Sequence, residues 1–247
     1  MKHARVRAAG EDMDVVVETP ERLRTAAGRL LDERDVTWLP PRHGTIFALG
    51  LNYADHAAEL DFKAPTEPLI FIKAPSSLIG HKQSCVRPTN VEYMHYEAEL
   101  VAVIGRAARH VSRDHAMGYI RGYTVCNDFA VRDYLENYYR PNLRVKSRDT
   151  LTPLGPWVVD KEDVADPHNL SVRTRVNGEV RQEGNTRDMI FTIPVLVEYL
   201  SRFLTLHPGD MISTGTPKGL SDVRPGDVVE VEVEGVGRLE NRIVESD

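Results

Sequence analysis

Short segments with the periodicity of β-strands recur along the chain, and long helical segments rarely separate them. Leu170–Val176 and Glu179–Glu183 flank Asn177-Gly178, a dipeptide typical of type I′ hairpin turns. Valines alternate with charged residues in Val228–Glu234, as in a strand with one buried face. Because strands do not alternate regularly with helices, a doubly wound parallel sheet is disfavoured. We predict an α+β, mostly β fold, in which a rolled or barrel-like mixed sheet carries peripheral helices.

The other elements are predicted from apolar runs and capping residues. Leu100–Ile104 is an unbroken apolar run that indicates a buried strand within Tyr96–Gly105. Further strands are predicted at Thr45–Leu51, Leu69–Ile72, Tyr123–Val131, Met211–Thr214 and Arg238–Val244. Helices are predicted at Tyr53–Leu60, between Ser112 as N-cap and Gly122 as terminator, and from Pro194 to Leu204.

The chain is expected to divide near residue 43. Residues 1–43 are predicted to form a small N-terminal unit, and residues 44–247 a single catalytic domain. Within the first unit, Thr19 can cap a helix that has Pro20 at its first position and apolar residues at helical spacing. The dipeptide Pro40-Pro41 then interrupts regular structure.

Composition excludes several classes of protein. With a net charge of −6 and no long run of Lys or Arg, the chain is not expected to bind nucleic acid. Cys85 and Cys126 are too few and too isolated for a disulfide framework or a zinc signature. No stretch approaches the roughly 18 apolar residues of a membrane span, and no apolar core of a secretion signal follows the basic start. We expect a cytoplasmic protein that does not contact membranes.

Three acidic residues occur where charge is unexpected. Glu97 and Glu99 are two residues apart in the predicted buried strand, so their side chains share one face. Asp128 lies in a second apolar run, Tyr123–Ala130. Like charges in a core are costly unless a cation joins them, and an all-oxygen set favours Mg²⁺ or Mn²⁺ over zinc. The alternative is that Glu97 and Glu99 lie at a solvated strand end and Asp128 in a turn.

Five motifs in this order resemble those of the fumarylacetoacetate hydrolase family. They are the segments 48–56 (ALGLNYADH) and 95–100 (HYEAEL), Asp128, Lys146, and the loop 214–219 (TGTPKG). Together they span residues 48–219 and are much more specific than any one of them. The resemblance implies the family's mixed β-roll, a homodimer, and a divalent cation held by Glu97, Glu99 and Asp128.

The resemblance also implies roles for polar residues around these ligands. His56 and Glu59 would form a proton-shuttling pair on one helix face, in a segment that acts as a lid in relatives, and Lys146 would orient the substrate or a water. Lys73, Arg132 and Thr216 would bind the substrate. For each side chain there is a plainer interpretation: a surface ion pair, a solvated cation, or an ordinary turn hydroxyl.

Residues 90–97 and 136–146 resemble one branch of the family more narrowly. That branch acts in homoprotocatechuate (4-hydroxyphenylacetate) catabolism on small 2-oxo di- and tricarboxylates. The resemblance implies decarboxylation of 5-oxopent-3-ene-1,2,5-tricarboxylate, isomerisation of 2-hydroxyhepta-2,4-diene-1,7-dioate, or both, through an enolate that the metal stabilises.

Two alternatives stay open. The first is an acylpyruvate or fumarylpyruvate hydrolase, although Leu135 stands where some hydrolytic relatives carry a glutamine. The second, from another class, is a non-catalytic subunit that pairs with an active homologue. A separate homologous subunit is also a conceivable partner of an active chain.

Overall fold

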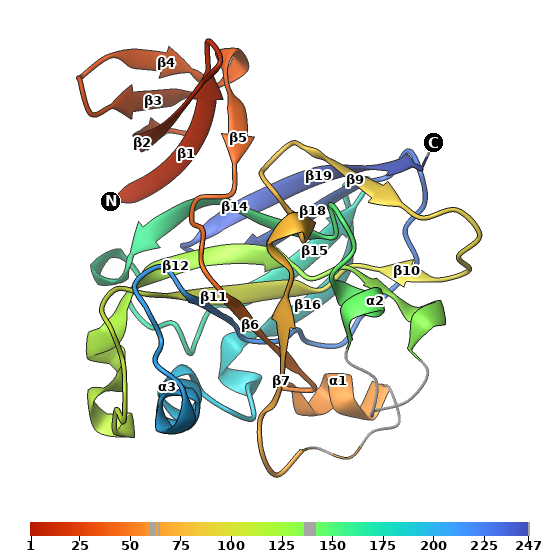
Figure 1. Cartoon of the computed structure of the whole chain (residues 1–247). Coiled ribbons are helices and arrows are strands. Elements are labelled where there is room, and N and C mark those ends of the chain that lie inside the picture. The colour runs from red at the N-terminus through yellow and green to blue at the C-terminus, as the bar shows by residue number, and fades with distance from the viewer. Residues whose placement is uncertain (60–62, 64, 136–141, 247) are drawn as a thin grey trace.

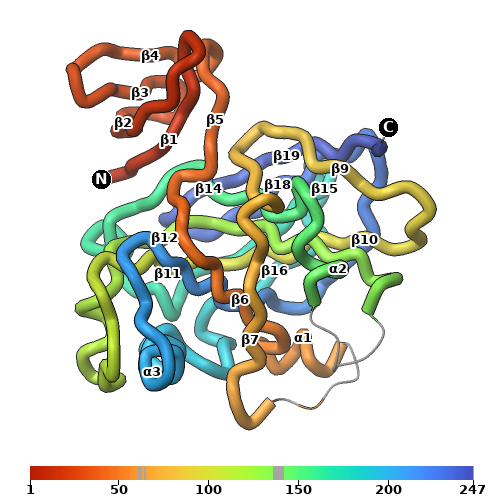
Figure 2. Tube along the Cα trace, viewed as in Figure 1, coloured from red at the N-terminus to blue at the C-terminus, as the bar shows by residue number. Residues whose placement is uncertain are grey.

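The computed structural model describes residues 1–59, 63, 65–135 and 142–246. The expected segment 136–146 therefore lies partly outside the described residues, as does Leu60 at the end of the first expected helix. Figures 1 and 2 show β1 to β4 grouped together at one end of the molecule, while the helices α1, α2 and α3 lie toward the other end.

The N-terminal strands form the first part of one large sheet. They are β1 (Lys2–Ala8), β2 (Glu11–Thr19), β3 (Arg22–Thr25), β4 (Leu30–Asp32) and β5 (Thr37–Leu39). The strands that follow are β6 (Ile46–Gly50), β7 (Leu69–Lys73), β8 (Leu78–Ile79), β9 (Ser84–Arg87), β10 (Met94–His95), β11 (Ala98–Ile104), β12 (Ile120–Asn127), β13 (Ala130–Val131) and β14 (Thr152–Asp160). The last five are β15 (Ser171–Val176), β16 (Glu179–Asn185), β17 (Met211–Ser213), β18 (Val228–Val233) and β19 (Gly237–Glu245).

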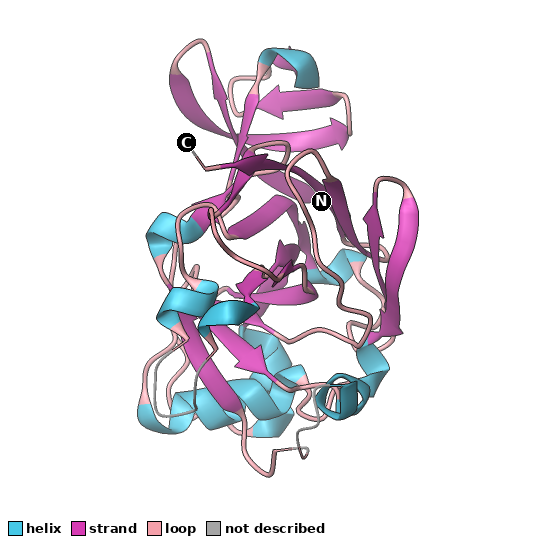
Figure 3. Ribbon diagram, turned by 90° about the vertical axis from the view of Figure 1, so that its right-hand side faces the viewer, coloured by secondary structure: helices cyan, strands magenta, loops and turns pink. Residues whose placement is uncertain are grey.

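The large sheet runs in the order β4-β3-β2-β1-β14-β12-β11-β17-β6-β7, with β5 paired to β1 and β8 to β14. A second sheet has the order β16-β15-β18-β19-β9, and β10 pairs with β13. Most pairs are antiparallel, but three are parallel: β6 with β17, β8 with β14, and β9 with β19. β18 and β19 pack against β11, β12 and β14, so the two sheets enclose the core. The predicted mixed, mostly β fold is confirmed (Figure 3).

Burial follows the sequence pattern closely in the strands. Every residue of β11 is buried, as its unbroken apolar run predicts, because β12 and β17 cover its edges and the second sheet covers a face. β18 alternates between half-buried and buried residues, with Val229, Val231 and Val233 at the buried positions. The Asn177-Gly178 turn has positive φ at both residues, as a type I′ hairpin requires.

The helices are few and short. They are α1 (Ala54–Glu59), α2 (Leu143–Lys146) and α3 (Ile193–Phe203), with 3-10 turns at Glu33–Asp35, Pro75–Ser77, Arg113–Tyr119, Arg132–Tyr134, Lys161–Asp163 and Thr186–Asp188. α1 and α3 lie where helices were predicted, and the helix expected after Ser112 is a 3-10 helix. In the described part of the chain, none of these helices has the length and apolar character needed to cross a membrane.

Two local predictions are wrong. The helix expected to start at Thr19 is absent, because this segment forms the hairpin of β2 and β3, where Val17 pairs with Leu23. The helical spacing of its apolar residues is coincidental, and the valines of β2 favour a strand. Gly122 does not end a helix: it lies inside β12, where a side chain would collide with the Val159 carbonyl, 2.2 Å from the position of a Cβ.

Candidate active site and metal centre

Three buried carboxylates meet where β11 and β12 lie side by side. Ala98 pairs with Asn127 in the antiparallel register, which places Glu97 and Glu99 beside Asp128. The Asp128 amide donates to the Glu97 carbonyl at 2.9 Å, and the Glu97 amide donates to Asn127 Oδ1 at 3.0 Å. One oxygen from each carboxylate lies within 4.8 Å of the other two. Pairing between two strands therefore creates the cluster.

Glu99 is the most deeply enclosed of the three. Its Oε2 accepts hydrogen bonds from Ser213 Oγ at 2.6 Å and from the Gly215 amide at 2.9 Å. Its Oε1 is buried and has no hydrogen-bond partner among the described residues. Burial, with Asp128 and Glu97 nearby, raises the pKa of Glu99 to about 8. One oxygen is thus fixed by the protein and the other is left for a positive ligand.

Two buried lysines offset part of this negative charge. Lys73 Nζ donates to Asp128 Oδ1 and to the Lys146 carbonyl. Lys146 Nζ lies 2.7 Å from Glu97 Oε2 and 3.0 Å from Asp128 Oδ2. Burial alone would raise the pKa of Asp128, but Lys146 and Lys73 hold it below its usual value. The same carboxylates raise the pKa of Lys146 despite its burial.

The cluster fits a hard divalent cation. It presents carboxylate oxygens only, and when all three carboxylates are ionised the two lysines leave one negative charge unbalanced. Glu99 Oε1 is a buried acceptor without a partner within the described residues, which is unfavourable unless a cation completes its shell. Oxygen-only sets of this kind are typical of Mg²⁺ and Mn²⁺ sites. The residues present are therefore able to hold such an ion.

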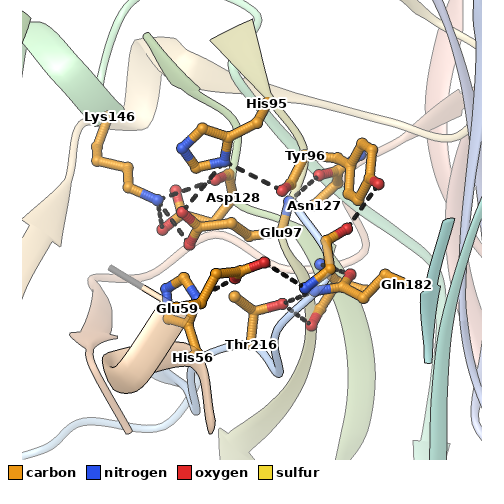
Figure 4. A network of polar contacts seen from close by, with 12 residues as sticks. His56, Glu59, His95, Tyr96, Glu97, Asn127, Asp128, Lys146, Gln182 and Thr216 are labelled. Atoms are coloured by element: carbon orange, nitrogen blue, oxygen red, sulfur yellow. Dashed lines mark hydrogen bonds and ion pairs between the residues drawn. The ribbon is translucent and has the colours of Figure 1, made fainter. Parts of the chain in front are cut away.

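His56 and Glu59 of α1 form a contact that reaches the loop 214–219 (Figure 4). His56 Nδ1 lies 3.3 Å from Glu59 Oε2, and Glu59 Oε1 accepts a hydrogen bond from the Gly219 amide at 3.0 Å. His56 is buried, with 5% of its surface exposed, so it is not a solvated surface histidine. Because Glu59 faces Nδ1, Nε2 is the ring nitrogen left for another partner.

Thr216 is held by residues that the sequence did not single out. Its hydroxyl donates to the Ala98 carbonyl at 2.9 Å and accepts from Gln182 Nε2 at 2.8 Å. Gln182 comes from β16, is 1% exposed, and also donates to the Pro217 carbonyl at 2.6 Å. The single hydroxyl proton of Thr216 is thus used within the protein, and its role as a substrate contact stays a prediction.

His95 and Asn127 are two further polar residues beside the cluster (Figure 4). His95 is fully buried, its Nδ1 lies 3.5 Å from Glu97 Oε1, and its Nε2 has no partner in the described part of the chain. Burial lowers the pKa of His95 to about 4, although Glu97 opposes this. His95 is the first residue of the segment 95–100 that the sequence singled out, whereas only its position next to Asp128 could have marked Asn127.

The structure brings together most of the predicted site residues. Lys73 and Lys146 contact the carboxylates directly, whereas His56, Glu59 and Thr216 belong to a network joined to β11 through the loop 214–219. Arg132 begins a 3-10 turn after β13 and is half-buried. Its backbone amide donates to the Tyr93 carbonyl at 2.9 Å, and within the described residues its side chain forms no ion pair with the cluster.

A family model for the C-terminal domain of fumarylacetoacetate hydrolase matches residues 45–244. The chain belongs to the fumarylacetoacetate hydrolase family. The match covers the carboxylates, both lysines and the loop 214–219, and it leaves out β1 to β5. The family assigned from five short motifs is therefore confirmed.

Three known proteins place the chain within this family. It is 71% identical over 208 residues to the 4-hydroxyphenylacetate degradation bifunctional isomerase/decarboxylase of Salmonella dublin, covering 84% of this chain and 48% of that protein. The chain thus spans about half the length of this curated relative. A solved 5-carboxymethyl-2-hydroxymuconate delta-isomerase from Mycobacterium smegmatis matches all of both chains, with 36% identity and a TM-score of 0.89.

The third protein is a maleylpyruvate hydrolase from a Sphingobium species, solved in complex with manganese(II) and pyruvate. It shares 26% identity with this chain and has a TM-score of 0.84, and the match covers all of both chains. A fold of this kind thus accommodates a divalent metal ion together with a 2-oxo acid.

Proposed function

We propose that this chain decarboxylates 5-oxopent-3-ene-1,2,5-tricarboxylate, isomerises 2-hydroxyhepta-2,4-diene-1,7-dioate, or does both, with Mg²⁺ or Mn²⁺ as cofactor. The observation that carries the proposal is the buried set of Glu97, Glu99 and Asp128, which has the oxygen donors that such an ion requires. The isomerase/decarboxylase of Salmonella dublin, at 71% identity, supports the choice of reaction.

The charge of the site suits an anionic substrate. When all three carboxylates are ionised, they and the two lysines sum to −1, and a divalent cation changes the total to +1. When bound, the cation would supply Lewis-acid polarisation of the substrate's 2-oxo group. Lys146 would hold the substrate carboxylate next to the 2-oxo group, since its ammonium group already lies beside the carboxylates of Glu97 and Asp128. Lys73 and Arg132 are proposed as further anion contacts.

His56 is proposed to move the proton. Both reactions need a proton to be added to a carbon of the substrate's dienolate, and isomerisation also needs one to be removed. His56 Nε2 would carry this proton, while Glu59 fixes the ring through Nδ1 and supports its basicity. The Glu59 contact with the Gly219 amide would keep α1 closed over the loop 214–219, so that water is kept from the dienolate.

The test uses the full chain, stripped of metal and then given Mg²⁺ or Mn²⁺. Freshly generated tricarboxylate is added, and CO₂ release and the ultraviolet spectrum are followed. We expect release that depends on the added ion and is lost in Glu97→Ala. Arg29→Gln serves as a control, because Arg29 is exposed in the N-terminal unit, outside the family match.

Other outcomes would redirect the proposal. Formation of pyruvate and a free acid from an acylpyruvate, with the tricarboxylate untouched, would show a hydrolase instead. Absence of Mn²⁺ binding in calorimetry would favour the non-catalytic subunit. Isomerisation without CO₂ release would restrict the proposal to one of its two reactions.

We also propose that the chain works as a pair, either as a homodimer or with a homologous subunit. Its match to only 48% of the Salmonella relative supports this, because a second domain of similar size would complete that length. Residues 1–43 are proposed as a unit appended to the catalytic domain. Light scattering of the purified chain would distinguish a dimer from a monomer.

A further inference from the structure

A crevice lies between the N-terminal strands and the opposite end of β11 from the carboxylates. Its volume is about 430 Å³. Its charged lining consists of Arg5 from β1, Arg42 and His43 from the linker after β5, Arg121 from β12, and Asp14 from β2. Elements from both parts of the chain thus bring three guanidinium groups to one place.

The arginines differ in how far the protein neutralises them. Arg5 forms long ion pairs with Asp12 at 3.8 Å and Asp14 at 3.9 Å, and it contacts His43 Nε2. Within the described residues, neither Arg42 nor Arg121 forms an ion pair or a side-chain hydrogen bond. In a chain with a net charge of −6, such a concentration of positive charge is unusual. Three like charges near one another are unfavourable, and an anion would relieve this repulsion.

Arg42 is half-buried and forms no ion pair within the described residues. Burial, with Arg121 and Arg5 nearby, lowers its pKa below the usual value for arginine. A freely solvated surface arginine would not show this combination of burial and like-charged neighbours. Its position is also constrained, because it lies between Pro41, which is buried, and Gly44.

Close backbone packing builds the wall of the crevice. A Cβ on Gly44 would lie 2.2 Å from the Gly209 carbonyl oxygen, and a Cβ on Gly105 would lie 2.9 Å from Arg121 Cβ. The linker and β12 therefore approach the neighbouring loops as closely as glycine allows. This packing constrains the backbone at and next to Arg42 and Arg121.

The crevice is separate from the candidate active site. Gly105 directly follows β11 and is six residues from Glu99, which corresponds to about 20 Å at the usual strand rise of roughly 3.3 Å per residue. None of the lining residues belongs to the carboxylate cluster or the loop 214–219. Most of the basic groups also come from segments outside the family match, residues 45–244.

We propose that this crevice binds a small anion with two or more negative charges, a phosphate or a polycarboxylate, through Arg5, Arg42 and Arg121. Guanidinium groups bind both classes through paired hydrogen bonds, and the volume suits a molecule of this size. Because the ligand would contact β1, the linker and β12 together, it would also strengthen the attachment of the N-terminal unit to the rest of the chain.

The test is calorimetric titration of the full chain, freed of divalent ions, with inorganic phosphate and separately with citrate at constant ionic strength. We expect at least one of them to bind with one site per chain. Arg42→Gln and Arg121→Gln should each weaken binding about tenfold, since each removes a charge-assisted contact. Arg42→Lys should keep part of the affinity, and Arg29→Gln should leave it unchanged.

The comparison of ligands and variants makes the result decisive. Tighter binding of phosphate or of citrate identifies the class of ligand. Absence of binding by both would overturn the proposal, as would binding that persists in Arg42→Gln and Arg121→Gln, because the ligand would then lie elsewhere. The readout needs neither metal nor substrate, so it is independent of the proposed enzymatic activity.

Discussion

The N-terminal sheet and the carboxylate cluster use charged residues in opposite ways. In the hairpin of β1 and β2, Arg7 pairs with Asp12 at 2.6 Å on an exposed surface. In the cluster, Lys73 and Asp128 pair with 2% and 1% of their surfaces exposed. The residue types are similar, but only the buried pair has lost its water. The contrast teaches that burial, rather than the presence of an ion pair, decides how strongly replacing a charged residue changes the free energy of unfolding.

The largest effect should come from breaking the buried pair. Lys73→Met leaves Asp128 with Lys146 as its only cationic partner among the described residues, and Asp128→Asn leaves the buried Lys73 without its carboxylate. Each should lower the free energy of unfolding by about 3–5 kcal/mol. Urea denaturation followed by tryptophan fluorescence would measure this. A loss of under about 1 kcal/mol in both variants would contradict the argument.

A smaller effect is expected at His81, which contacts both β5 and β19. His81 Nδ1 accepts the Glu240 amide at 3.0 Å, and its ring packs edge-on against Trp38 of β5 at 5.5 Å. Burial, aided by Arg238, lowers the pKa of His81 to about 4. Between about pH 6.5 and 4, the unfolded chain therefore takes up a proton that the folded chain does not.

Stability should consequently fall as pH decreases through this window, by at most about 3 kcal/mol from His81. The free energy of unfolding would be measured at several pH values for the protein and for His81→Gln, which cannot titrate there. The difference between the two curves isolates the histidine. Parallel curves would show that His81 does not contribute.

A double-mutant cycle on Lys73 and Asp128 would sharpen the comparison further. Combining Lys73→Met with Asp128→Asn removes both charges, so the double variant should be more stable than the sum of the single losses predicts. We expect a coupling energy of about 1–3 kcal/mol. Strictly additive losses would mean that the two residues act independently.

The smallest effect should come from the exposed pair. Arg7→Gln, Asp12→Asn and their combination should leave the denaturation midpoint unchanged within experimental error, because water solvates both groups in either state. The same urea titration serves as the measurement. A clear shift in midpoint would show that the hairpin of β1 and β2 depends on charge after all.

Local patterns predicted many of the strands in the two sheets. The run Leu100–Ile104 and the Asn177-Gly178 turn are set by neighbours in sequence, so the sequence was sufficient for both. The spacing of Glu97 and Glu99 likewise placed them together. The motifs identified the family, although the catalytic and binding roles of individual residues remain predictions.

Contacts between distant segments could not be predicted in this way. Lys73 lies 55 residues from Asp128, and Gln182 lies 34 residues from Thr216, so no local pattern joins them. The N-terminal helix was wrong for a related reason. Leu23 has helical spacing from later apolar residues, but its pairing with Val17 across the hairpin decides the structure.

The hydrogen bond from Ser213 to Glu99 has a consequence for synthesis of the chain, because the two residues are 114 positions apart. At roughly 5–20 residues per second, a ribosome adds Ser213 about 6–23 seconds after Glu99. During that interval the acidic side chain lacks both Ser213 and Gly215. The centre therefore matures late in translation, and a nascent chain released before residue 213 cannot complete it.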